Sequence, residues 1–91
     1  MNLSDLKNWY SDHHEATFHD FFTFLRFKTI ATDPQYDSDT KKCADWLVSY
    51  LNKIGLEATS WKTSGQPVVF AKHTKAGKDR PTLLIYQHYD V

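Results

Sequence analysis

The residues best suited to do chemistry are His88 and Asp90, separated by one tyrosine in a chain of 91 residues. In an extended backbone, residues i and i+2 project to the same side, so the imidazole and the carboxylate are predicted to lie together. A carboxylate bonded to one imidazole nitrogen fixes the tautomer and leaves the other nitrogen free for a metal ion. The alternative is a structural hydrogen-bonded pair without a ligand, and these residues alone leave both open.

The element that would position this pair is the apolar run 82–86. A continuous apolar run is typical of a strand buried on both faces, and ligands of open α/β sheets bind at the carboxyl ends of such strands. Two further strands, over 56–62 and 67–73, are expected to form a hairpin. We therefore expect 67–73 and 82–88 to be neighbouring strands of one sheet.

Two helical regions precede these strands. Residues 3–27 carry Phe and Leu side chains at helical spacing, which predicts a buried face on one helix or on two helices separated near Ser11. A second helix is predicted over 37–55, where Asp37 or Ser38 can cap the start and Gly55 can end it. Its predicted buried stripe consists of Cys43, Trp46, Leu47, Tyr50, Leu51 and Ile54.

Two other groups of residues suggest metal sites but do not match the motifs. The helical zinc motif needs a second His four residues after the first, and from His14 that position is Phe18. A calcium loop counted from Asp33 has Ser38 in place of Gly and Ala44 in place of the final Glu. We therefore expect the histidines of the first helix to be solvated, mainly opposite its Phe stripe, and the aspartates to cap helices or lie in loops.

Composition restricts the class of protein. Eleven basic and eleven acidic residues cancel, which argues against nucleic-acid and membrane-surface partners. The single cysteine, Cys43, excludes an internal disulfide and is typical of a reducing compartment. Without an apolar segment of signal-peptide or membrane-helix length, the sequence predicts a cytoplasmic location. The basic stretch Lys62–Arg80 is interpreted as a solvated face, with an anion-binding surface as the alternative.

Four segments resemble one family in the expected order. Pro81–Val91 resembles the first metal-ligand segment of the dinuclear zinc peptidases, the family of carnosinase-like dipeptidases, aminoacylase, acetylornithine deacetylase, succinyl-diaminopimelate desuccinylase and glutamate carboxypeptidase. Upstream, Phe24–Ala31 resembles the family's "FLRIPSVSA", Ala44–Glu57 its "AEWL…LGLE", and Gly65–Ala71 its "GHPVVYA". Together the matches cover about residues 20–91 and point to the dipeptidase branch.

The resemblance implies a fold, an activity and site residues. The fold is α/β, with amino-terminal helices followed by strands of a mixed sheet, so that 1–91 is the amino-terminal part of a catalytic domain, cut after its first metal motif. His88 matches a ligand of one of two zinc ions, and Asp90 matches the acidic residue that orients it and is usually counted as catalytic. The implied activity is hydrolysis of a dipeptide or N-acyl amino acid by a metal-activated water. A homodimeric parent is one option that the resemblance leaves open.

Two positions depart from the family pattern. Gln87 stands where the family usually has Gly, which admits a closer backbone approach, and Lys28-Thr29 replaces the usual Pro-Ser. The other metal ligands and the glutamate base would come from sequence beyond 1–91, so this chain alone is predicted to be inactive. The alternative is a non-catalytic truncated product or isolated folding unit that acts only by association.

Overall fold

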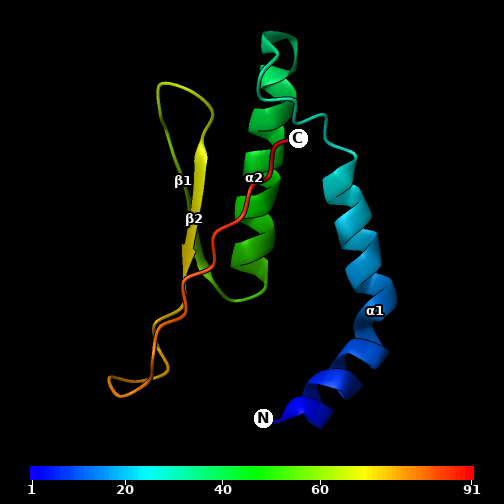
Figure 1. Ribbon diagram of the computed structural model, residues 1–91, viewed down its shortest axis with the longest axis vertical. Coiled ribbons are helices and arrows are strands. Elements are labelled where there is room, and N and C mark those ends of the chain that lie inside the picture. The colour runs from blue at the N-terminus through cyan, green and yellow to red at the C-terminus, as the bar shows by residue number, and fades with distance from the viewer.

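The protein contains two helices followed by a two-stranded antiparallel sheet, so it is mixed α/β in a general sense (Figure 1). The computed structural model describes all residues 1–91. Neither helix is long and apolar enough to cross a membrane. In chain order the elements are α1 (Leu3–Leu25), a 3-10 turn (Pro34–Tyr36), α2 (Asp37–Lys53), β1 (Glu57–Trp61) and β2 (Val68–Lys72).

The packed part of the molecule is α2 against the β1–β2 hairpin. Cys43 and Ala44 are completely buried, and they are the only buried hydrophobic residues in the chain. Successive strand residues point to opposite faces, and alternate residues of the hairpin are half-buried: Ala58, Val69 and Ala71. The register pairs Ala58 with Ala71, so two small, half-buried side chains lie side by side in the hairpin. The prediction that Cys43 is a buried packing residue is confirmed, but the predicted burial of its stripe is wrong at Ile54, which is exposed at the end of the helix.

Both ends of α2 have a clear local cause. Gly55 adopts φ +103°, as predicted for a left-handed C-cap. The Gly55 N–H donates to the Asn52 carbonyl and the Leu56 N–H donates to the Leu51 carbonyl, which is the Schellman arrangement. At the start, the predicted capping role of Asp37 or Ser38 is wrong, because α2 has no side-chain cap.

The residue that caps this part of the chain is Asp33. Its carboxylate accepts a hydrogen bond from the Gln35 N–H at 3.0 Å and so begins the 3-10 turn. The turn runs directly into α2, so one cap serves both elements and the amino end of α2 needs no second one. Asp33 thus has the capping role expected of these aspartates.

α1 is one continuous helix, and it begins with a capping box. The Asn2 side chain accepts from the Asp5 N–H at 3.0 Å, and the Asp5 carboxylate accepts from the Asn2 N–H at 2.9 Å. The predicted burial of its Phe stripe is wrong, since no residue of α1 is buried. Only the last turns of α1 approach the packed part of the molecule. There Phe24 of α1 and Phe27, which follows the helix, lie against Trp46.

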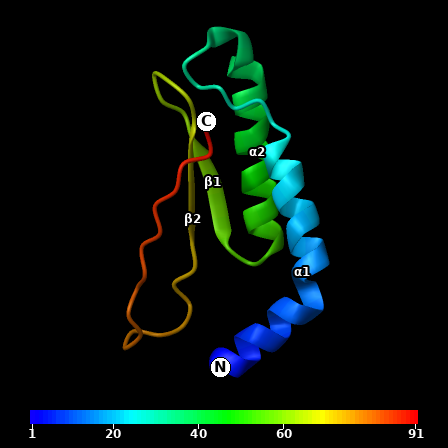
Figure 2. The same cartoon turned by 45° about the vertical axis from the view of Figure 1, so that its right-hand side comes forward.

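The predicted strand over 82–88 is also wrong. Residues 82–91 are extended but unpaired, and their only backbone hydrogen bond joins the Val91 N–H to the Thr29 carbonyl at 2.9 Å. Figures 1 and 2 show this segment running back along the hairpin without joining it. Burial on both faces requires a layer on each side, and residues 1–91 provide neither. The run Leu83–Tyr86 is therefore 70–88% exposed.

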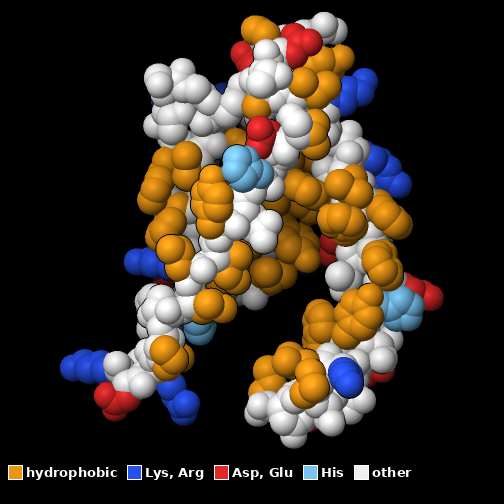
Figure 3. Space-filling view, in the orientation of Figure 1, with side chains coloured by type: hydrophobic (Ala, Val, Ile, Leu, Met, Phe, Trp, Pro, Cys, Tyr) orange, Lys and Arg blue, Asp and Glu red, His pale blue; other side chains and the backbone are white.

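The exposed apolar surface is unusually large. The total accessible surface of the chain, polar and apolar together, is 7854 Å². A folded monomer of 10.6 kDa exposes about 5,500 Å² in total, so the excess is roughly 2,400 Å². Figure 3 shows hydrophobic side chains along α1, over the hairpin and on the 82–91 segment, with open space beside the lower half of α1. A standard interface buries about 800 Å² per partner, so the excess is enough for extensive association.

We predict that the isolated chain self-associates at micromolar concentration, because exposed apolar runs and unpaired strand edges promote association. Sedimentation velocity should detect dimers or larger species. The double substitution Phe21→Asp and Leu84→Asp, one in α1 and one in the extended run, should shift the distribution toward monomer. A wild-type chain that sediments as a single monomeric species would contradict the prediction.

We further predict that the Cys43 thiol is unreactive in the folded chain. Burial raises its pKa to about 11, so the neutral thiol predominates at pH 8 and the reactive thiolate is scarce. The raised pKa stabilises the fold fully below the unfolded value of about 8.5 and progressively less as pH rises toward the folded value. A colorimetric disulfide reagent should react slowly at pH 8 and rapidly after addition of denaturant. Equal reaction rates with and without denaturant would show that the Cys43 thiol is not buried.

Candidate functional site: the Tyr86, His88 and Asp90 row

The pair predicted from sequence lies in a row of three side chains on one side of the extended segment. The His88 Nδ1 lies 2.9 Å from the Asp90 Oδ1, which confirms that the two side chains lie together. The Tyr86 hydroxyl lies 3.0 Å from the His88 Nε2. The spacing i, i+2 and i+4 places all three on the same side because side chains alternate along an extended backbone.

The hydrogen bonds fix the tautomer of the neutral imidazole. An ionised carboxylate only accepts hydrogen bonds, so the His88 Nδ1 carries the proton and donates to Asp90. The Nε2 is then the acceptor, and the Tyr86 hydroxyl donates to it. The arrangement therefore directs the Nε2 lone pair away from Asp90, and a metal ion at this nitrogen would have to replace the tyrosine hydroxyl.

The electrostatics of the pair follow from the same contact. The hydrogen bond from His88 lowers the pKa of the Asp90 carboxyl below its ordinary value. The carboxylate therefore stays ionised to lower pH and keeps its place on the Nδ1. The His88 side chain is 67% exposed and the Asp90 side chain 38% exposed, so the row lies open to solvent.

Two contacts hold the end of the segment in place beside the row. The Tyr89 hydroxyl donates to the Pro67 carbonyl, and the Val91 N–H donates to the Thr29 carbonyl. Tyr89 is half-buried, and burial raises the pKa of its hydroxyl, helped by the nearby Asp90 carboxylate. The tyrosine points to the opposite side from His88, so it fixes the backbone while His88 and Asp90 stay exposed.

The row can supply one metal ligand. With its Nδ1 held by a carboxylate, the His88 imidazole has its Nε2 as the nitrogen that could bind a metal ion. A catalytic zinc ion needs about three protein ligands, and the chain contains no group of three or more His, Cys, Asp or Glu side chains suited to a metal ion. The row alone therefore falls short of the ligand set that a catalytic zinc ion needs.

The histidines of α1 form no such group. They are exposed, as predicted, and the His13 Nδ1 and His14 Nδ1 lie on backbone carbonyls of their own helix. His14 also lies between Tyr10 and Phe18, 6.3 Å from the Phe18 ring centre in an edge-on arrangement. The expectation that the histidines lie mainly opposite the Phe stripe is thus wrong for His14.

Sequence reasoning missed the two tyrosines. The apolar run 82–86 predicts that Tyr86 lies in a buried strand. The period of two that places His88 beside Asp90 also places Tyr86 beside His88, so this contact was predictable. Tyr89 alternates to the other side, which was also predictable. Its partner, Pro67, lies 22 residues away, and no local pattern identifies such a contact.

Comparison of the chain with models of protein families, with curated proteins and with solved structures found no match.

We predict that the Asp90 carboxyl titrates below its ordinary range because His88 donates to it. Its contribution to stability is present above the unfolded pKa and is lost as pH falls through the lower folded pKa. Carbon-detected NMR of the carboxyl should show the pKa rise toward its ordinary value in His88→Ala. His73→Ala, which removes an exposed histidine elsewhere, is the matched control and should leave it unchanged. An unaltered Asp90 pKa in His88→Ala would show that the pair does not form.

Proposed function

We propose that residues 1–91 are the amino-terminal part of a dinuclear zinc hydrolase that cleaves dipeptides or N-acyl amino acids. The observation that carries this proposal is the 2.9 Å contact between the His88 Nδ1 and Asp90. The contact leaves the Nε2 as the metal-facing nitrogen, which is the arrangement that a zinc-binding imidazole with a supporting carboxylate requires. The resemblance of four segments to the zinc peptidases supports the same assignment.

Each residue of the row has a defined part in this proposal. His88 would hold one zinc ion through its Nε2, and Asp90 would keep the imidazole in the required tautomer and orientation. Zinc, when bound, polarises a carbonyl and lowers the pKa of a bound water. Tyr86 would leave the Nε2 as the metal arrives, and its hydroxyl would then be free to donate elsewhere.

Completion of the site needs side chains beyond those described. The two glutamates of the chain do not reach it: Glu15 lies on α1, and Glu57 lies within 4.0 Å of Lys72 and Lys75 at the other end of the hairpin. A glutamate base and further carboxylate ligands would therefore come from sequence outside 1–91. The cytoplasmic location and the dipeptide or N-acyl amino acid substrate are parts of the same proposal.

The second candidate is a non-catalytic product that acts by association. Its support is the exposed run Leu83–Tyr86 together with an α1 that has no buried residue. Such surfaces bind other chains without any metal. The two candidates differ in whether His88 matters for activity, so one set of variants separates them.

We predict that the 91-residue chain hydrolyses no dipeptide, because one imidazole leaves most of the zinc coordination to water. A longer protein that contains this segment should hydrolyse dipeptides in a zinc-supplemented assay. There, Asp90→Ala should lower the rate by about 10- to 100-fold, and His88→Ala should lower it further because a ligand itself is removed. His73→Ala is the control and should be as active as wild type.

Two outcomes would overturn this proposal. Undiminished activity of the longer protein after His88→Ala would show that the site is assigned wrongly. Turnover by the 91-residue chain that disappears on His88→Ala would show that the ligands considered missing are present.

A further inference from the structure

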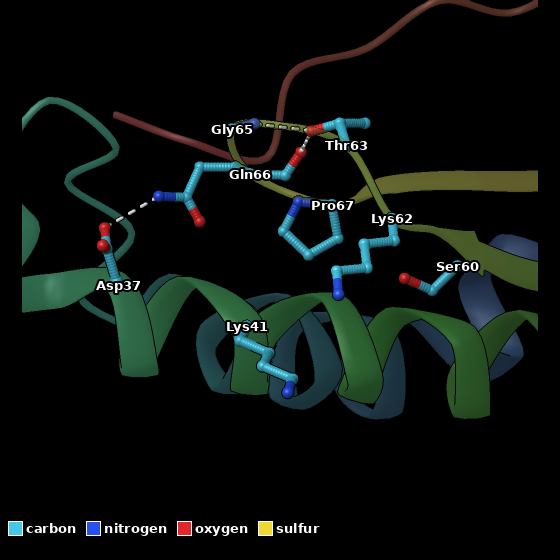
Figure 4. A pocket seen from close by; sticks show the side chains of 8 residues that line it. All are labelled: Asp37, Lys41, Ser60, Lys62, Thr63, Gly65, Gln66 and Pro67. Carbon is cyan, nitrogen blue, oxygen red and sulfur yellow. Dashed lines mark hydrogen bonds between the residues drawn. The ribbon is translucent and has the colours of Figure 1, made fainter.

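A second polar feature lies where the loop after β1 meets the first turns of α2. It is a hollow of about 470 Å³ with no hydrophobic side chain in its lining. Figure 4 shows the lining residues: Asp37, Lys41, Ser60, Lys62, Thr63, Gly65, Gln66 and Pro67.

The two lysines of the hollow have no acidic partner. The ion pairs of the chain involve Lys72, Lys75 and His88, so neither Lys41 nor Lys62 has a carboxylate within 4.0 Å. The one carboxylate of the lining, Asp37, accepts a hydrogen bond from the Gln66 side-chain amide at 2.8 Å. The lining therefore carries two positive charges that are in no ion pair and one negative charge, on a carboxylate that accepts from Gln66.

The hydroxyl groups and the loop geometry add to this. In Figure 4 the Ser60 hydroxyl is turned toward the Lys62 ammonium group, which extends from the end of β1 across the surface of α2. Thr63 accepts from the Gly65 N–H at 3.0 Å and donates to the Gln66 carbonyl at 2.7 Å. These bonds stabilise the loop 63–66, which forms the side of the hollow next to Lys62.

We propose that this hollow binds a small phosphate dianion, either free phosphate or a phosphate monoester. Lysine ammonium groups act as compact point charges toward phosphate, and with Lys41 and Lys62 against Asp37 the lining keeps a net positive charge that favours an anion. The Ser60 hydroxyl provides a neutral donor beside Lys62. This proposal does not depend on the hydrolase assignment, because the hollow shares no side chain with the row Tyr86, His88 and Asp90.

The test is a titration of the chain with inorganic phosphate, followed by the NMR shifts of the Thr63, Gly65 and Gln66 amides. Chloride keeps the ionic strength constant, because salt screens exposed charges. We expect saturable shifts with a dissociation constant on the order of 1 mM. Lys62→Met and Lys41→Met should each weaken binding about fivefold, the effect of one charge contact at an exposed site.

Two further variants serve as controls. Lys78→Met removes an exposed lysine of the 73–81 loop and should bind as wild type does, and Lys62→Arg keeps the charge and should retain binding. Shifts that rise linearly without saturation, or equal affinities for Lys62→Met and Lys78→Met, would overturn the proposal. A parallel titration with glycerol phosphate distinguishes the ligands: tighter binding than phosphate assigns a monoester, and equal or weaker binding assigns free phosphate.

Discussion

The close approach of α2 to the hairpin is the contact on which the rest of the molecule depends. Its fully buried hydrophobic side chains on the helix are Cys43 and Ala44, and Ala58 and Ala71 are half-buried in the hairpin that packs against α2. Small side chains of this kind let a helix and a sheet approach closely. The Asn52 side chain strengthens the same junction, because it accepts from the Ala58 N–H at 2.8 Å and donates to the Ala58 carbonyl at 3.3 Å.

Both polar sites are positioned by this junction. The hairpin holds Pro67 where Tyr89 can donate to it, and Tyr89 in turn fixes the backbone beside His88 and Asp90. The same hairpin closes its loop over the start of α2, where the Gln66 amide meets Asp37. A shift of the hairpin along α2 would therefore disturb the imidazole row and the lysine-lined hollow together, although the two share no side chain.

The sequence predicted those features whose causes are local. The apolar stripe and Gly55 identified α2 and its end, strand-forming residues around a turn identified β1 and β2, and the i, i+2 rule brought His88 and Asp90 together. The errors concern burial. An apolar pattern shows which face of α1 or of 82–86 would be buried in a complete fold, but the covering side chains must be present. No other helix or strand of residues 1–91 covers Phe18 or Leu84, so the same patterns give exposed surfaces.

The anchoring of the last residues has a consequence for how the chain tolerates change in length. Two hydrogen bonds set the place of His88 and Asp90: the Tyr89 hydroxyl donates to the Pro67 carbonyl, and the Val91 N–H donates to the Thr29 carbonyl. The residues 73–81, which follow β2, make no hydrogen bond to this end of the chain. The loop 73–81 is exposed throughout, and lengthening a flexible surface loop adds little to its closure entropy. Insertions or deletions between Lys75 and Arg80 should thus leave the imidazole and carboxylate where they are, which makes this loop the part of the chain most free to vary.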